Sequence, residues 1–127
     1  MRVFPGAAIA LALISASAQA GVVSNYDEWL FYQLQVRGEP VLLFVTDDSC
    51  EPCATEELSI RKLVAGGKYS KVNVLKIDGR KQSRTARALG AKERPTLIGF
   101  SGFTETGRIS NASDTSRVSA LLESTLH

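Results

Sequence analysis

The sequence has few of the residues that build metal and haem sites. Only two cysteines, one histidine and one methionine occur in 127 residues, and the methionine is Met1. A closed zinc site needs four ligands, which these side chains do not supply. Covalent haem is excluded because Ala54, not a histidine, follows the second cysteine. We therefore expect no resident metal or cofactor.

The sequence also has no large excess of charge of one sign. The formal net charge is +2. It falls to +1 if residues 1–20 are removed, because Arg2 is the one charged residue among them. A nearly neutral domain gives no electrostatic reason to expect nucleic-acid binding.

A hydrophobic run long enough to span a membrane is missing. The apolar segment 3–17 is shorter than the roughly 20 residues that cross a bilayer. It follows Arg2 and precedes Ala18-Gln19-Ala20, a small-residue pattern typical of a signal-peptide cleavage site. We expect residues 1–20 to be a cleavable signal peptide and 21–127 to be one domain that is periplasmic or otherwise exported. The alternative is a retained membrane anchor.

The two cysteines, Cys50 and Cys53, are separated by only two residues. They follow the apolar run 41–45 and precede a helical pattern over 54–64. The N-terminus of a helix carries partial positive charge and free N–H groups, which favour a reactive thiolate. A disulfide that closes so short a loop adds little chain-entropy stabilisation. The pattern therefore predicts a redox-active pair rather than a structural bridge.

The two sulfurs are expected to have different roles. Cys50, at the tip of the helix, is predicted to be exposed and to attack a substrate disulfide. Cys53 is predicted to be more buried and to resolve the mixed disulfide. Between them, Glu51 and Pro52 are expected to modulate the site, and Pro52 suits the first helical turn.

The remaining pattern predicts an α/β domain with a central mixed β-sheet flanked by helices. Parallel strands are expected in the first half and an antiparallel hairpin at the end. Ser24 is expected to cap the first helix, whose apolar face includes Trp29. The motif helix has Leu58, Leu63 and Val64 as its apolar residues and Glu56, Glu57, Arg61 and Lys62 as its polar ones. Other strands are expected at 72–77, 96–100 and 103–109, with helices at 83–89 and after a cap at Ser113 or Asp114.

The sequence resembles the thioredoxin family over residues 25–126. The resemblance depends on a strand leading into Cys50-Glu-Pro-Cys53, a strand ending at Asp78, and Arg94-Pro95-Thr96-Leu97 before the final hairpin. It implies the thioredoxin fold and exchange with protein disulfides or thiols. It also implies that Pro95 is cis and lies beside the disulfide, and that Arg94, Pro95 and Thr96 contact the substrate.

Several positions depart from the family pattern. Phe44 and Val74 occupy the places of the family's buried acid and its lysine partner. Asp47, Asp48 and Glu51 are near enough to substitute for the acid, although solvated positions are expected for them. Arg94 precedes the proline, and we expect its cation to lie near the disulfide and to stabilise the Cys50 thiolate.

We therefore expect an exported protein-disulfide oxidoreductase, acting as a reductase or exchange protein rather than a dedicated oxidase. The basis for that direction is the small size and the Glu-Pro dipeptide. Such a reductase is expected to be a monomer that receives electrons from a membrane thiol relay. Two alternatives remain open: a copper-handling thiolate pair and a thioredoxin-like interaction module without catalytic activity.

Overall fold

The computed structural model describes residues 19–111 and 114–127. Most of the predicted signal peptide, residues 1–18, lies outside the described residues. The fold is a five-stranded sheet with strand order β1-β3-β2-β4-β5. The strands are β1 (Val23–Asn25), β2 (Pro40–Thr46), β3 (Asn73–Asp78), β4 (Thr96–Ser101) and β5 (Thr104–Ser110). The helices are α1 (Glu28–Val36), α2 (Glu51–Val64), α3 (Ser83–Ala88) and α4 (Thr115–Ser124), with a short 3-10 helix η1 (Gly67–Tyr69).

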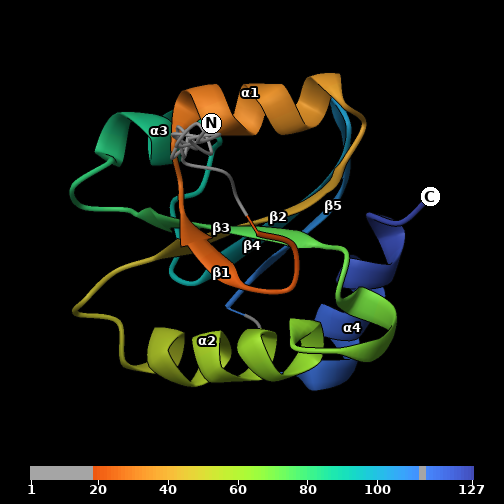
Figure 1. Ribbon diagram of the computed structural model, residues 1–127. Coiled ribbons are helices and arrows are strands. Elements are labelled where there is room, and N and C mark those ends of the chain that lie inside the picture. The colour runs from red at the N-terminus through yellow and green to blue at the C-terminus, as the bar shows by residue number, and fades with distance from the viewer. Residues whose placement is uncertain (1–18, 112–113) are drawn as a thin grey trace, which may run out of the picture.

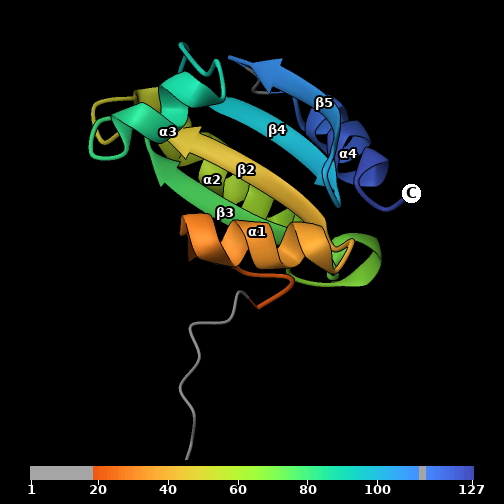
Figure 2. The ribbon, with the colours of Figure 1, turned by 90° about the horizontal axis from the view of Figure 1, so that it is seen from above.

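The helices cover both faces of the sheet. Figures 1 and 2 show α1 and α3 on one face, with α2 and α4 on the other. Side chains of β2 alternate between these two layers. Leu42 and Phe44 pack in the cluster under α2 and α4, while Val41, Leu43 and Val45 pack in the cluster under α1 and α3. β2 is therefore buried on both faces, as its apolar sequence predicts.

Strand directions agree with the prediction. β1, β3 and β2 run parallel, while β4 pairs antiparallel with β2 and β5. In a parallel arrangement the carboxyl ends of β2 and β3 lie at the same edge of the sheet, and the register pairs Thr46 with Asp78 there. The Cys-x-x-Cys turn begins at that edge, immediately after β2.

The prediction for the start of the domain was wrong in two respects. Ser24 lies in edge strand β1 opposite Leu75, and it does not cap α1. Asp27 is the cap instead, and its carboxylate accepts the N–H of Leu30 at 2.9 Å. Trp29 is 64% exposed and stacks on Tyr32 rather than entering the core. Three extended residues are too few to give a recognisable strand pattern in the sequence.

The buried face of α2 agrees with the predicted apolar pattern at Val64 and differs from it at Glu56 and Leu58. Its buried residues are Cys53, Glu56, Ile60 and Val64, while Leu58 is 61% exposed. The buried stripe therefore follows the helical spacing set by Cys53, not the placement of apolar residues alone. A carboxyl side chain, Glu56, lies on the core side as a result.

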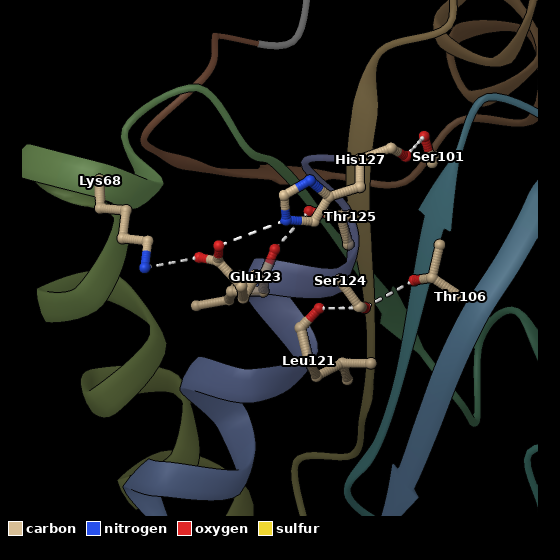
Figure 3. A network of polar contacts seen from close by, with 9 residues as sticks. Lys68, Ser101, Thr106, Leu121, Glu123, Ser124, Thr125 and His127 are labelled. Atoms are coloured by element: carbon tan, nitrogen blue, oxygen red, sulfur yellow. Dashed lines mark hydrogen bonds and ion pairs between the residues drawn. The ribbon is translucent and has the colours of Figure 1, made fainter.

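Polar contacts fix α4 against its neighbours (Figure 3). The Ser124 hydroxyl lies 2.8 Å from that of Thr106 on β5, and Lys68 of η1 pairs with Glu123 at 2.9 Å. Asp114 caps the helix by accepting the Ser116 N–H, and it is one of the two residues predicted as the cap. The other, Ser113, lies outside the described residues. Within the described parts of the chain, no helix is long and apolar enough to cross a membrane.

Candidate redox site

A disulfide joins Cys50 and Cys53 at the start of α2, with their Cα atoms 5.3 Å apart. Cys50 is the N-cap of the helix, and its Sγ accepts the backbone N–H of Cys53 at 3.2 Å. The Cys50 N–H donates in turn to the Asp47 carbonyl at 3.0 Å. Because an N–H dipole points at Cys50 Sγ, the turn favours negative charge on this sulfur once the disulfide opens.

The two sulfurs differ in exposure in the predicted direction. Cys50 is partly exposed, whereas Cys53 is 2% exposed and belongs to the core cluster under α2. An incoming substrate disulfide therefore reaches Cys50 first. Glu51 and Pro52 are both exposed in the first turn, and Pro52 occupies the position predicted for it.

Pro95 follows a cis peptide bond from Arg94, as the family resemblance implies. The register pairs Thr96 with Val45, which places Pro95 beside the end of β2 where the cysteine turn begins. Pro95 is buried, and its carbonyl accepts the Asn111 N–H at 2.9 Å. Thr96 is buried as well, and its hydroxyl donates to the Glu93 carbonyl at 2.7 Å. The substrate contacts expected of these residues remain predictions.

Arg94 is held by loop carbonyls. Its Nη1 donates to the carbonyls of Ala91 at 2.6 Å and Glu93 at 3.1 Å, and Nη2 donates to Gly79 at 3.4 Å. A Cβ added at Gly79 would overlap this guanidinium, so the glycine makes room for it. Arg94 does not line the cavity that contains both cysteines. Its expected influence on the Cys50 thiolate therefore remains a prediction.

A cavity of about 410 Å³ opens beside the disulfide. Its charged lining comprises three carboxylates and one ammonium group, from Asp47, Asp48, Glu57 and Lys76. Lys76 Nζ lies 2.7 Å from Glu57 Oε1, and the other oxygen of Glu57 accepts from Arg61 Nη2 at 2.9 Å. The ion pair between Lys76 and Glu57 therefore links β3 to α2 next to the sulfurs.

Two of these carboxylates are poor proton acceptors. Asp47 accepts the Ser49 hydroxyl at 2.6 Å and the Ser49 N–H at 2.8 Å, and these bonds hold its pKa below the usual value. Burial raises the pKa of Glu57, but bonds and charges from Lys76 and Arg61 outweigh this and lower its pKa overall. Of the predicted substitutes for the missing buried acid, Asp47 and Asp48 line the cavity and Glu51 does not.

Sequence reasoning missed Glu56, a carboxyl group on the buried face of α2. It is 3% exposed, and its Oε1 has no hydrogen-bond partner in the structure as described. Burial raises the pKa of this carboxyl. The signal in the sequence was its position three residues after Cys53, on the same side of the helix. Among the described residues, no group of three or more His, Cys, Asp or Glu residues is arranged to hold a metal ion.

Comparison with known proteins shows the fold. No family model and no curated protein matches the chain. Among solved structures, the protein Trxlp from Edwardsiella tarda EIB202 matches with a TM-score of 0.75 and 27% identity, over 80% of this chain and 98% of that one.

Two thioredoxins match over similar lengths. A mutant thioredoxin from Halobacterium salinarum NRC-1 gives a TM-score of 0.71 at 22% identity, over 89% of this chain and 96% of that one. Oxidised thioredoxin O2 from Arabidopsis thaliana gives a TM-score of 0.69 at 23% identity, over 86% of this chain and 96% of that one. The predicted fold is therefore confirmed: this chain has the thioredoxin fold, with a Cys-x-x-Cys disulfide at the start of α2.

Proposed function

We propose that this protein is an exported protein-disulfide oxidoreductase that works as a reductase or exchange protein. The observation that carries the proposal is the asymmetric disulfide: a partly exposed Cys50 with an N–H on its sulfur, joined to a buried Cys53. Cys50 forms the mixed disulfide with a substrate protein. Cys53 then displaces the substrate thiol and restores the intramolecular disulfide.

The charges around the cavity support the reducing direction. A thiolate stabilised by its surroundings favours the reduced protein and makes the disulfide a strong oxidant. Here three carboxylates and a single ammonium group line the cavity next to the sulfurs, and Arg94 is turned to loop carbonyls. A site with net negative charge stabilises thiolates less, so electrons pass more readily from the cysteines to a substrate.

Turnover of a disulfide-bonded protein such as insulin, with dithiothreitol as the electron source, tests the activity. The native chain is expected to accelerate reduction well above the uncatalysed rate, and Cys50→Ser is expected to abolish the acceleration. Reduced Cys53→Ser, mixed with the oxidised substrate after dithiothreitol has been removed, is expected to accumulate a mixed disulfide through Cys50, because no second sulfur resolves it. Turnover that survives Cys50→Ser would contradict the proposal, as would a Cys53→Ser variant that traps nothing.

Export is supported by the Arg2, apolar and Ala18-Gln19-Ala20 pattern. Outside the cytosol, the reduced cysteines need an electron donor, which we propose to be a membrane thiol relay serving a monomeric protein. N-terminal sequencing after expression with the native leader is expected to give Gly21 as the first residue. A product that starts at Met1 and stays in the cytosol would contradict the location.

A further inference from the structure

The packing of α2 does not explain why the acid Glu56 lies on the buried face of this helix. Its carboxyl lies at 3% exposure on a helix face otherwise formed by Cys53, Ile60 and Val64. Its Oε1 makes no hydrogen bond within the described structure. A buried polar atom without a partner destabilises a fold, and an apolar side chain would suit the site better. A catalytic role for the carboxyl would explain why the chain tolerates this loss of stability.

The helix places Glu56 next to the buried cysteine. Residues three apart on an α-helix are neighbours on one face, with Cβ atoms about 5–6 Å apart. Helical side chains also lean toward the N-terminus of their helix. The side chain of Glu56 therefore leans over the turn that carries Cys53, inside the same buried layer.

Among the residues that the structure describes, no other carboxyl near the disulfide is both buried and without a hydrogen-bond partner. Asp47 is bonded to Ser49, and Glu57 is bonded to Lys76 and Arg61. Charged and titratable groups on the described elements that pack against α2 are Lys68 and Tyr69 of η1, Lys76 and Asp78 of β3, and Arg117 and Glu123 of α4. None of them contributes to the pKa of Glu56, whose rise is due to burial alone.

We propose that Glu56 accepts the proton of the Cys53 thiol during resolution of the mixed disulfide. This inference rests on the proposed function. In the step, Cys53 sulfur forms a bond to Cys50 sulfur while the bond from Cys50 to the substrate sulfur breaks. The proton of the Cys53 thiol passes to the Glu56 carboxylate, and the substrate leaves as a thiolate that takes a proton from water. Electrons balance because the cysteine pair is oxidised as the substrate disulfide is reduced.

The protonation chemistry is suited to this transfer. A general base is most effective when its pKa lies near the operating pH. The ordinary carboxyl pKa lies several units below that of a thiol, and burial of Glu56 moves its pKa upward, toward the thiol. The fixed pairs of Asp47 and Glu57 move those carboxyls in the opposite direction.

A two-phase thiol assay tests the proposal. The reduced protein is mixed with one equivalent of dithiobis(nitrobenzoate), and release of nitrothiobenzoate is followed by stopped flow. The first phase reports attack by Cys50, and the second reports displacement by Cys53. Glu56→Gln is expected to slow the second phase at least tenfold at pH 7 and to leave the first phase unchanged.

The pH profile separates proton transfer from a structural effect. As the pH rises from 7 toward about 10, thiols ionise increasingly without the help of a base, and the rates of the second phase in Glu56→Gln and in the native protein are expected to draw together. Glu56→Leu, which fills the apolar site, is expected to behave like Glu56→Gln. As a control, Glu28→Gln replaces an exposed carboxyl on α1, across the sheet, and is expected to leave both phases unchanged.

Three results would overturn the inference: a native-like second phase at pH 7 in Glu56→Gln, a slow second phase that persists at high pH, or loss of the second phase in Glu57→Gln instead. Failure of the proposed function would look different. In that case the native protein itself would not accelerate the reduction of insulin, whatever residue stands at position 56.

Discussion

At the residue scale, two neighbouring carboxyls on α2 have opposite environments. Glu56 is buried without a partner at Oε1, and burial raises its pKa. Glu57, one residue later, is paired with Lys76 and Arg61, and its pKa is lowered despite partial burial. Groups whose pKa values are pushed apart in this way indicate a division of labour between a proton acceptor and a fixed charge.

These opposite shifts predict opposite pH dependences of stability. Because its pKa is raised in the fold, Glu56 binds a proton more tightly in the native state than in the unfolded state. Its contribution to the free energy of unfolding therefore decreases as the pH rises from the unfolded-state pKa to the folded-state pKa. Glu56→Gln is therefore expected to gain about 1 kcal/mol in the free energy of unfolding, relative to the native protein, between pH 4 and pH 8. Urea unfolding of both proteins at several pH values measures this difference.

Glu57→Gln is the matched control in the same experiment. Because the pKa of Glu57 is lowered in the fold, its stabilising contribution is present above the unfolded pKa and disappears as pH falls through the folded one. The variant is expected to lose up to about 1 kcal/mol at pH 8 and little in strong acid. If both substitutions change stability with pH in the same direction, the assigned environments are wrong.

The residues that carry the chemistry were predictable where a motif names them. The cysteine pair and the proline after Arg94 have fixed spacing and recognisable neighbours, and the structure has the expected disulfide and cis peptide. Glu56 was not predictable from polarity, because a charged side chain on a helix is usually exposed. Its burial depends on the tertiary position of Cys53, which sets the core face of α2.

At the element scale, β3 and α2 are joined beside the disulfide by the ion pair of Lys76 and Glu57. Val74 points into the core cluster with Phe44 and Cys53. Lys76 follows two residues later on the same face of the strand, at the cavity. The positive charge of β3 therefore lies next to the sulfurs, although neither the acid nor the lysine position of the family is polar here.

Removing the charge of Lys76 and removing the charge of Glu57 should shift the reduction potential of the cysteine pair in opposite directions. Among the described residues, Lys76 is the one cation that lines the cavity. Lys76→Met removes this charge, destabilises the cysteine thiolate and is expected to lower the reduction potential. Glu57→Gln is expected to raise it. We expect shifts of about threefold in the equilibrium constant with glutathione, or roughly 15 mV for two electrons. Arg61→Met, which loses a contact to the same carboxylate but does not line the cavity, should change the potential less. A higher potential in Lys76→Met would contradict this account.

The corrected start of α1 gives a second test at this scale. Asp27→Ala removes the side chain that accepts the Leu30 N–H and is expected to cost about 1 kcal/mol of unfolding free energy. Ser24→Ala changes a side chain on the short edge strand and is expected to cost less than half as much. Denaturant unfolding of the two variants decides between the caps, and equal or reversed losses would restore the sequence-based assignment.

Elements with a clear sequence pattern were predicted to within three residues of their observed ends. β2 is predicted at 41–45 and observed at Pro40–Thr46, while α3 is predicted at 83–89 and observed at Ser83–Ala88. The three-residue β1 was missed because its pairing with β3, not its own sequence, makes it a strand. Trp29 was misplaced because Phe31 and Leu34 alone supply the buried face of α1.

At the scale of the whole molecule, the topology explains why distant segments meet at one site. Parallel pairing brings the carboxyl ends of β2 and β3 together, and antiparallel pairing returns the start of β4 to the same edge. The cysteine turn, Lys76 and Pro95 therefore lie within one end of the sheet. This arrangement followed from the order of elements in the sequence, whereas the charges that face the cavity depended on the packed structure.

The reduction potential of the Cys50–Cys53 couple tests the central claim most directly. The protein is equilibrated in glutathione buffers, and its free thiols are counted by alkylation. A redox-active pair is expected to give one reversible two-electron transition between about −270 and −120 mV, toward the lower end because of the acidic cavity. A disulfide that stays closed below about −300 mV would be a structural bridge, and that result would contradict the account.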